Sequence, residues 1–428
     1  MLDSLIKSGA LRLETETSTR SSFGLNLDLN ALSTKEIEQG LREFFSGRIA
    51  NPNPEELIHS VKELEDRFSG FNEYQFAKAA VLEQACDFTR AREILVRLAR
   101  QMPSDSRILH RLAVMHLNMG SAQEAQDAYL AALAVASKSE NLRREFAGLL
   151  RVMEARKLHA GVRGKKHGLS VVCAIKNEAD DLLEWLHFHR LAGVDHFYLY
   201  DNQSTDETRK VIESFPWPDM ITYHYVEGDF GQMRAFHHAI DSYRNSSEWC
   251  AFIDADEFLY PVEGENIKDV LQDVSSAPAV AVHWLNFGSN GHEERPQGLC
   301  IESFTRRAPD DFPDHYVMKS IVRPDAIVAY LHPHQSLVLG CYVQEDGTPV
   351  FPIGGRCSVP KRRKLAINHY YTKSRQQLLK KRERGRPLAE GDPERIRAME
   401  FFTLRDRNDV EDLTIQKFLP GLKKLLDS

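Results

Sequence analysis

Residues 249–261 read WCAFIDADEFLYP, an apolar run followed at once by acidic residues. The run at 249–253 predicts a short buried strand that ends at Asp254. Alternate side chains of an extended segment share one side, so we expect Asp254 and Asp256 to reach a common ion. Carboxylate oxygens suit Mg²⁺ or Mn²⁺. Two solvated acids at a strand end are the plainer alternative, but the order of elements around them favours the metal.

Strand-like and helical patterns alternate on both sides of this stretch. Strands are predicted at 169–175, 196–200, 221–226, 279–287, 316–322 and 327–331. Helices are predicted at 180–192, 231–243, 373–386 and 410–426, and residues 204–207 (STDE) have capping-box spacing before another. This order predicts an α/β fold with a doubly wound, mostly parallel sheet.

Polar residues follow three of these strands where each one ends. They are KNE at 176–178, DNQS at 201–204 and DADE at 254–257. Ligands of open α/β sheets bind beyond the carboxyl ends of the strands, so these residues predict one binding site. A turn before a capped helix is the alternative for Asp201, and a helix-start acid is the alternative for Glu178.

An internal repeat precedes the α/β pattern, at residues 72–157. An offset of 34 places Ala79 on Ala113 and then on Ala147, and places Ala91 on Ala125. Small residues at these points let paired helices approach closely. The segment resembles tetratricopeptide repeats, with about two units and a capping helix near 140–157. An ordinary helical hairpin bundle is the alternative.

Composition narrows the class of protein. The net charge of −7 argues against nucleic-acid binding by bulk charge, and the six cysteines form no CxxC pair. The N-terminal sequence has no secretory signal, and apolar runs are too short to span a membrane, so we expect a cytoplasmic protein. The basic runs at 361–364 and 380–386 are expected to be solvated faces, with a clamp on the diphosphate or contact with the inner face of the membrane as alternatives.

Several motifs in order carry a family resemblance. They are IKNEADDLLEWLHFHRLAGVDHFYLYDNQSTDET, GQMRAFHHAI and WCAFIDADEFLYP, then WLNFGSNGH, KSIVRP, HPH and NHYYTKS. With them, residues 169–385 resemble the GT-A glycosyltransferases of the family-2-like group, close to glycosyltransferase family 92 and its bacterial relatives. The implied fold is a GT-A type, Rossmann-like sheet behind an all-α tetratricopeptide-like domain.

The resemblance implies roles for individual residues. Those lining the nucleotide pocket would be Lys176, Asn177 and Glu178, with Asp201 accepting from the uracil or ribose and Gln232 and Arg234 near the donor diphosphate. Those binding the metal would be Asp254, Asp256 and a C-terminal histidine, His369, with His332 and His334 as alternatives. An inverting enzyme also needs a carboxylate base, for which the candidates are Glu293, Glu294 and Asp314.

The predicted function is transfer of a hexose from a nucleotide-sugar, a UDP-sugar by preference, to a glycan or lipid-linked acceptor, with Mn²⁺ or Mg²⁺ and with the repeats binding a protein partner. Two alternatives remain: a nucleotidyltransferase, although KNEADD lacks its glycine-rich basic loop, and a non-catalytic scaffold with a relic transferase domain. The expected divisions are 1–71 (helical), 72–157 (repeats), 158–168 (linker), 169–385 (transferase) and 386–428 (helical tail).

Overall fold

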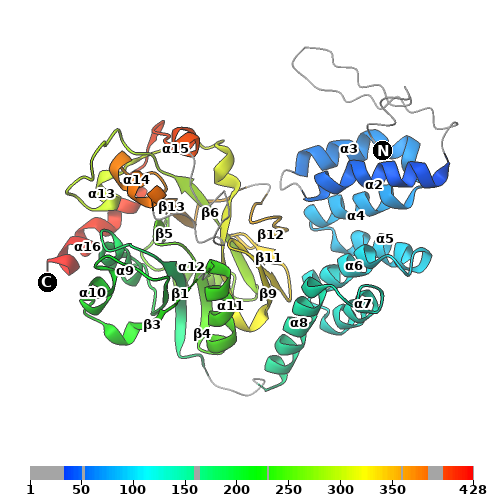
Figure 1. Ribbon diagram of the computed structural model, residues 1–428, viewed down its shortest axis with the longest axis horizontal. Coiled ribbons are helices and arrows are strands. Elements are labelled where there is room, and N and C mark those ends of the chain that lie inside the picture. The colour runs from blue at the N-terminus through cyan, green and yellow to red at the C-terminus, as the bar shows by residue number, and fades with distance from the viewer. Residues whose placement is uncertain are drawn as a thin grey trace, which may run out of the picture.

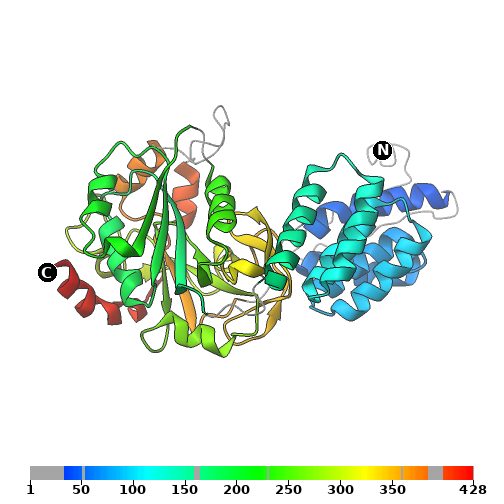
Figure 2. The same cartoon turned by 90° about the horizontal axis from the view of Figure 1, so that it is seen from below.

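The computed structural model describes residues 33–50, 54–158, 164–228, 231–357, 360–383 and 399–427. These residues form a helical region and an α/β domain, which lie side by side in Figure 1 and in the turned view of Figure 2. Residues 159–163 of the predicted linker lie outside the described part. Within the described residues, no helix is both long enough and apolar enough to cross a membrane.

The helical region consists of consecutive helices that pack on their neighbours. They are α2 (Thr34–Ala50), α3 (Pro54–Phe68), α4 (Asn72–Gln84), α5 (Phe88–Gln101), α6 (Ser106–Asn118), α7 (Ala122–Val135) and α8 (Glu140–Leu158). The first has the capping box that the sequence suggests: the Ser33 amide donates to Glu36 Oε2 at 2.8 Å, and the Glu36 amide donates to Ser33 Oγ at 3.4 Å. An all-helical N-terminal region is therefore confirmed.

Four of the five alanines that the offset of 34 places on one another are buried between helices. Ala79 and Ala113 are fully buried, as are Ala91 and Ala125, so small residues do stand where helices meet. Ala147, in contrast, is exposed, and the neighbouring Gly148 is buried in its place. The pattern fails there because α8 packs against the α/β domain and not against a further repeat.

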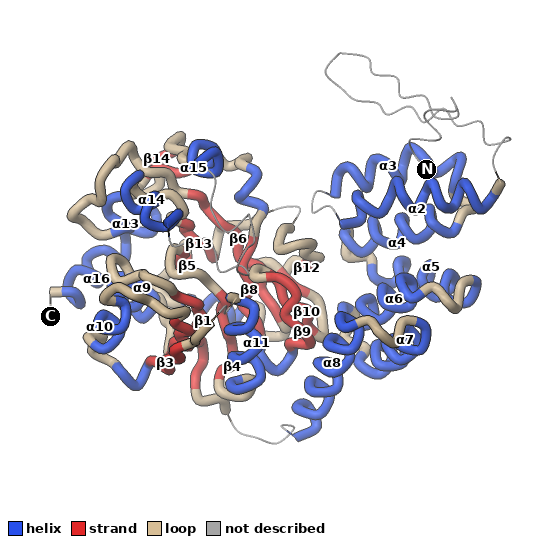
Figure 3. The backbone as a smooth tube through the Cα atoms, viewed as in Figure 1, coloured by secondary structure: helices blue, strands red, loops and turns tan. Residues whose placement is uncertain are grey.

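The α/β domain contains the remaining strands and helices (Figure 3). The strands are β1 (His167–Ile175), β2 (His196–Asp201), β3 (Ile221–Tyr225), β4 (Ser247–Phe252), β5 (Glu257–Pro261), β6 (Ala279–Asn286), β7 (Arg306–Arg307), β8 (Met318–Val322), β9 (Ile327–His332), β10 (Gln335–Val338), β11 (Tyr342–Val343), β12 (Pro349–Val350), β13 (Leu365–His369) and β14 (Val410–Glu411). The helices are α9 (Leu182–Leu191), α10 (Thr208–Glu213), α11 (Gln232–Tyr243), α12 (Ile267–Asp273), α13 (Cys300–Ser303), α14 (Arg375–Glu383), α15 (Met399–Arg405) and α16 (Leu419–Leu426).

The main sheet has the order β12-β11-β6-β8-β4-β1-β2-β3, and β13 joins β6 to β5. The strands β4, β1, β2 and β3 are parallel, and β8 runs antiparallel between β4 and β6. The α/β class and the mostly parallel sheet are thus confirmed. The antiparallel β8 is a feature that hydrophobic patterns could not reveal, because they do not encode strand direction.

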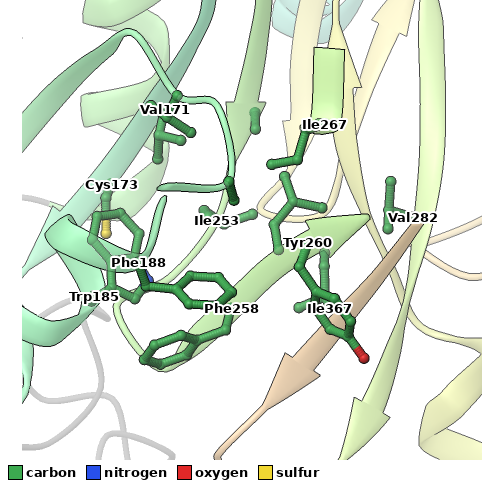
Figure 4. Close-up of a cluster of buried hydrophobic side chains, with 14 of the residues drawn as sticks. Val171, Cys173, Trp185, Phe188, Ile253, Phe258, Tyr260, Ile267, Val282 and Ile367 are labelled. Carbon is green, nitrogen blue, oxygen red and sulfur yellow. The ribbon is translucent and has the colours of Figure 1, made fainter. Parts of the chain in front are cut away.

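Side chains of β1 alternate between two hydrophobic cores, one on each face of the sheet. Val171 and Cys173 pack with α9 on one face, and Val172 packs with α11 on the other. Figure 4 shows the first core, where Trp185 and Phe188 of α9 lie beside Phe258 of β5. Helices on both faces of a buried sheet fix the strand ends in place.

Two local predictions are wrong. Residues 410–426 form β14, a 3₁₀ turn at Thr414–Phe418 and α16 instead of one amphipathic helix. Val410 and Glu411, the first residues of that segment, pair with β7 as an antiparallel strand and so do not join the helix. The STDE sequence does not cap α10, whose N-cap is Glu207 without a side-chain cap. Ser204 Oγ instead accepts from the amide of Asn177, in the loop after β1, at 2.9 Å.

The helical region joins the α/β domain through α8 and the hairpin of β9 and β10. Leu149 and Val152 of α8 share a hydrophobic cluster with Val328 and Leu337 of that hairpin. The backbones approach closely at Gly148, where a Cβ atom would stand 1.7 Å from the carbonyl oxygen of Val328. Only glycine permits this contact.

Gly148→Ala should therefore force α8 off the hairpin. We expect a loss of about 1–3 kcal/mol of unfolding free energy, the usual cost of overpacking a close contact. The matched control is Gly47→Ala in α2, where an added Cβ meets nothing within 4 Å. That control should be neutral or stabilising by up to about 1 kcal/mol. Urea denaturation of both variants measures the difference, and equal stabilities would contradict the docking contact.

Candidate functional site at the carboxyl edge of the sheet

Three parallel strands deliver their carboxyl ends to one edge of the sheet. Ile175 of β1 pairs with Asp201 of β2, and Val172 of β1 pairs with Phe252 of β4. The segments that follow these strands are the ones the sequence singled out, at 176–178, 201–204 and 254–257. Their positions on one edge agree with that expectation.

Residues 254–256 form a turn and not an extended segment. β4 ends at Phe252 and β5 begins at Glu257, and the Glu257 amide donates to the Asp254 carbonyl at 3.0 Å. Glu257 Oε2 accepts from the Asp254 amide at 2.9 Å, which closes the turn from the other side. The premise that alternation along a strand aligns the two aspartates is therefore wrong, and their carboxylates have separate partners.

Asp254 is held by two side chains from distant segments. Gln232, the first residue of α11, donates to Asp254 Oδ1. Lys319 of β8 donates to Asp254 Oδ2 at 2.8 Å, and its Nζ also lies 3.4 Å from Glu257 Oε1. The role of Gln232 in donor binding stays a prediction, and Lys319 appeared in the sequence only within the KSIVRP motif.

Lys319 is buried among these acids. Burial by itself would lower the pKa of Lys319, but Asp254 and Glu257 beside it raise that pKa above its ordinary value. Glu257 is completely buried, and this burial raises the pKa of its carboxyl despite the opposing charge of Lys319. The lysine therefore supplies the positive charge that this buried cluster requires.

Asp256 faces the other side of the turn. Lys381 of α14 donates to Asp256 Oδ2, and Nε2 of His369 lies 3.7 Å from the same oxygen. Nδ1 of His369 lies 3.2 Å from Oδ1 of Asn286, so the ring can donate there and keep the Nε2 lone pair toward Asp256. Burial lowers the pKa of His369, which favours its neutral form.

This geometry identifies the residues that fit a divalent cation. A neutral imidazole nitrogen and a carboxylate oxygen on one side of the turn are suitable ligands, and Asn286 orients the imidazole as second-shell partners do. Within the described ranges, no group of three or more His, Cys, Asp or Glu side chains is arranged to hold a metal. The chain thus offers Asp256 and His369 as the residues that would hold such an ion.

The two alternative histidines lie elsewhere. His334 packs against Trp284 at 5.1 Å between ring centroids, and its Nδ1 is 3.2 Å from the Met318 carbonyl oxygen. His332 stands next to it, with the two rings 5.1 Å apart. The Trp284 ring separates this pair from His369, whose centroid is 4.1 Å from that of Trp284. Of the three candidates, His369 is the one placed beside Asp256.

The loops after β1 and β2 are joined by hydrogen bonds. Asn177 has a left-handed backbone with φ of 51°, and its Oδ1 accepts from the Thr205 amide at 2.7 Å. The Glu178 amide donates to Thr208 Oγ1 at 2.8 Å. Asp201 is 1% exposed and accepts from the Ser204 amide and the Tyr223 hydroxyl, at 2.9 and 2.8 Å. These contacts agree with the turn alternative for Asp201.

A cavity of about 770 Å³ opens between the β1 loop and α14. Asn177 and Glu178 line one side, Lys380 and Lys381 line the other, and Asp256 lies in its wall. Arg234 is exposed on the first turn of α11, and Lys176 is partly buried; neither lines this cavity. The cavity joins the Asp256 side of the turn to the loop expected to bind a nucleotide.

Two buried acids of the α9 segment support the cavity wall. Lys373 donates to Asp181 Oδ2 at 2.5 Å. Burial would raise the pKa of Asp181, but the charge of Lys373 outweighs burial and lowers that pKa below its ordinary value. Glu184 accepts from the amides of Cys300 and Ile301, at 2.7 and 3.1 Å. Burial raises the pKa of Glu184 to about 7.

The three candidate bases differ in their surroundings. Glu293 and Glu294 are exposed, and Glu293 Oε2 lies 3.6 Å from Arg375 NH1 at the start of α14. Asp314 is partly buried, and Arg405 Nε donates to its Oδ2 at 2.7 Å. The Arg405 guanidinium stands 5.3 Å from the ring centroid of Tyr371, a cavity residue. Asp314 is thereby connected to the cavity rim.

Comparison with known proteins finds similarity to one family of enzymes. Residues 170–340 match the model of Glycosyltransferase family 92. A glycosyltransferase family 92 protein of Oryza sativa subsp. japonica is 30% identical over 49% of this chain and 34% of its own length. One of Ricinus communis is 32% identical over 39% of this chain and 31% of its own. The resemblance inferred from the sequence is confirmed over this segment, and the chain spans about a third of the length of these relatives.

A solved structure, "Crystal structure of S. aureus TarS 1-349 in complex with UDP", is also similar, at 15% identity and a TM-score of 0.25 over 37% of this chain and 47% of that one.

Lys319→Met should leave the buried Glu257, and the partly exposed Asp254 beside it, without their counter-charge. Breaking a buried pair in this way costs about 3–5 kcal/mol, so we expect a loss of that size in unfolding free energy. Lys364→Met is the control, because its pair with Asp273 is exposed and worth less than about 1 kcal/mol. The double variant Lys319→Met/Glu257→Gln should recover part of the loss. A Lys319→Met protein as stable as the parent in urea would contradict the account.

Glu184 should make stability depend on pH. Its folded pKa of about 7 exceeds the ordinary 4.5, so the stabilisation is complete below 4.5 and is lost as pH rises through 7. Between pH 5 and pH 8 the parent should lose about 2–3 kcal/mol relative to Glu184→Gln. Glu302→Gln, at a partly exposed ion pair with Lys423, serves as the control and should follow the parent at both pH values. If the unfolding free energies of the parent and Glu184→Gln changed equally with pH, the raised pKa of Glu184 would be refuted.

Proposed function

We propose that the α/β domain is a metal-dependent glycosyltransferase that moves a hexose from a UDP-sugar to a glycan or lipid-linked acceptor. The observation that carries the proposal is the cavity at the carboxyl edge, with Asp256 and His369 beside it and lysines opposite the β1 loop. The match of residues 170–340 to glycosyltransferase family 92 supports it. A nucleotidyltransferase finds less support, because the loop after β1 lacks glycine-rich phosphate-binding sequence.

In this proposal the two sides of the cavity bind different parts of the donor. The β1 loop, with Asn177 and Glu178, receives the nucleoside, and Asp201 holds that loop in place through the β2 turn. Lys380 and Lys381 of α14 are the proposed cations for the diphosphate, because they line the same cavity as Asp256. Arg234, exposed on the first turn of α11, remains the proposed second cation for the phosphates.

Mn²⁺ or Mg²⁺ would be held by Asp256 and His369, with Asp254 keeping the turn in position through Lys319 and Gln232. When bound, the ion neutralises charge that develops on the departing nucleoside diphosphate. Burial of His369 and the contact of its Nδ1 with Asn286 keep Nε2 available toward Asp256. Asp256 therefore presents one hard oxygen ligand to the cavity, with the imidazole of His369 in β13 beside it.

The acceptor proton needs a base on the far side of the donor sugar. Among Glu293, Glu294 and Asp314, we favour Asp314, because Arg405 links it to Tyr371 at the cavity rim. The two glutamates lie on an exposed loop beside the start of α14.

The helical region is proposed to bind a protein partner or to orient the acceptor. Its docking on the β9–β10 hairpin, with His332 and His334 between those strands, connects it to the Trp284 side of the site. We propose a cytoplasmic protein, with the basic runs as possible points of contact with the inner membrane face.

Asp256→Asn tests the metal in this proposal. The substitution keeps the shape of the side chain and removes its charge, so Mn²⁺ affinity should fall and hydrolysis or transfer of UDP-sugar should fall by about 100-fold or more. The loss should appear mainly in kcat, because the ion acts on charge that develops in the transition state. Chelator should abolish the activity of the parent.

Asp273→Asn is the matched control, since Asp273 is an exposed acid paired with Lys364 away from the cavity. Its activity should equal that of the parent with Mn²⁺ and with Mg²⁺. Transfer that survives chelator, or an Asp256→Asn protein with the activity of the control, would exclude the proposed ion.

A further inference from the structure

Three cysteines meet where the helical region contacts the α/β domain. Cys86 directly follows α4, Cys341 precedes β11, and Cys357 follows β12; all three are free thiols in the structure. Cys86 and Cys341 are partly buried, and Cys357 is buried. Because Cys86 belongs to one part of the molecule and Cys341 to the other, a bond between them would cross the contact.

Contacts on both sides hold these two residues together. The Gly340 amide, next to Cys341, donates to the Leu117 carbonyl of α6 at 2.8 Å. The ring of Phe88, two residues after Cys86, lies 6.4 Å from that of Phe351. Cys341 Sγ is 3.6 Å from the carbonyl oxygen of Val350, the residue before Phe351. These contacts bring the side chains of Cys86 and Cys341 within range of each other.

The backbone at Cys86 makes a cysteine there unexpected. The repeat offset of 34 places Cys86 on Gly120, and both residues are left-handed, with φ of 57° and 73°. Left-handed backbone favours glycine, and any other residue adds strain. A Cβ at Gly120 would meet nothing within 4 Å, so packing at that turn does not require a side chain. The side chain at Cys86 instead contacts the other part of the molecule through Cys341.

The two thiols differ in acidity. The side-chain contact with Cys341 lowers the pKa of Cys86, whereas the same contact and burial raise the pKa of Cys341. One sulfur is therefore the readier nucleophile and its neighbour is placed to resolve the product, which is the arrangement of redox-responsive cysteine pairs.

We propose that Cys86 and Cys341 are a site of reversible oxidation, at which a hydroperoxide converts the two thiols to a disulfide that ties the helical region to the α/β domain. This inference stands independently of the glycosyltransferase activity. A bond between residues so distant in sequence restricts the unfolded chain strongly and keeps the helices on the β9–β10 side of the domain.

The chemistry with hydrogen peroxide balances in two steps. The Cys86 thiolate attacks one peroxide oxygen, the O–O bond breaks, and the leaving hydroxide takes the Cys86 proton as water, which leaves a sulfenic acid. The Cys341 sulfur then attacks the Cys86 sulfur, the S–O bond breaks, and the second hydroxide leaves as water with the Cys341 proton. The two thiols lose two electrons and two protons, and one peroxide becomes two waters.

The full-length protein, reduced and then treated with a small excess of hydrogen peroxide, tests the proposal. We expect titratable thiols to fall from six to four and peptide mapping to yield one linked pair containing Cys86 and Cys341. The thermal midpoint should rise by several degrees, and dithiothreitol should reverse every change.

Cys86→Gly is the decisive variant, because glycine suits the left-handed backbone and folding should be kept or improved. It should keep all its thiols and show no rise in midpoint after peroxide. Cys357→Ser is the matched control and should still form the link. A pair between Cys341 and Cys357, a link between two chains, or unchanged thiols in the parent would each overturn the proposal.

Discussion

A buried lysine between two carboxylates sets the shape of the carboxyl edge. Lys319 contacts Asp254 and Glu257, and Glu257 in turn accepts the Asp254 amide. Without the lysine, the buried Glu257 and the partly exposed Asp254 would repel each other within a tight turn, and Glu257 could not be ionised at low cost. Lys319 lies in β8, which pairs antiparallel with β4, so the position of the lysine in the site depends on this strand pairing.

The turn that Lys319 stabilises divides the site into two sides. Asp254 lies on one side with Gln232 of α11 and Lys319, whereas Asp256 lies on the cavity side with His369 and Lys381. Glu257 also anchors the turn to the core, because its carbonyl accepts from the indole of Trp185 at 2.7 Å. A charge change at Asp256 can therefore alter ligand binding without disturbing the buried cluster, which is why the two aspartates call for different tests.

The β9–β10 hairpin links this edge to the helical region. Its strands pack Val328 and Leu337 against α8, and its turn carries His332 and His334 toward Trp284. The close contact at Gly148 and the thiol contact at Cys86 both fix the helices relative to this half of the sheet. The helical region is thus packed as a continuation of the α/β core and is more than an attached repeat array.

The sequence by itself determined the alternation of strands and helices, the mostly parallel sheet, the all-helical region before it and the position of the acidic residues after β4, because hydrophobic periodicity and short motifs are local properties of the chain. Tertiary structure alone decided the partners of that turn, since Lys319, Lys381 and His369 come from segments far from Asp254 in sequence. It also decided that Asp201 belongs to a buried turn and that Gly148, not Ala147, meets the hairpin. Such pairings depend on strand direction and backbone approach, which no local pattern encodes.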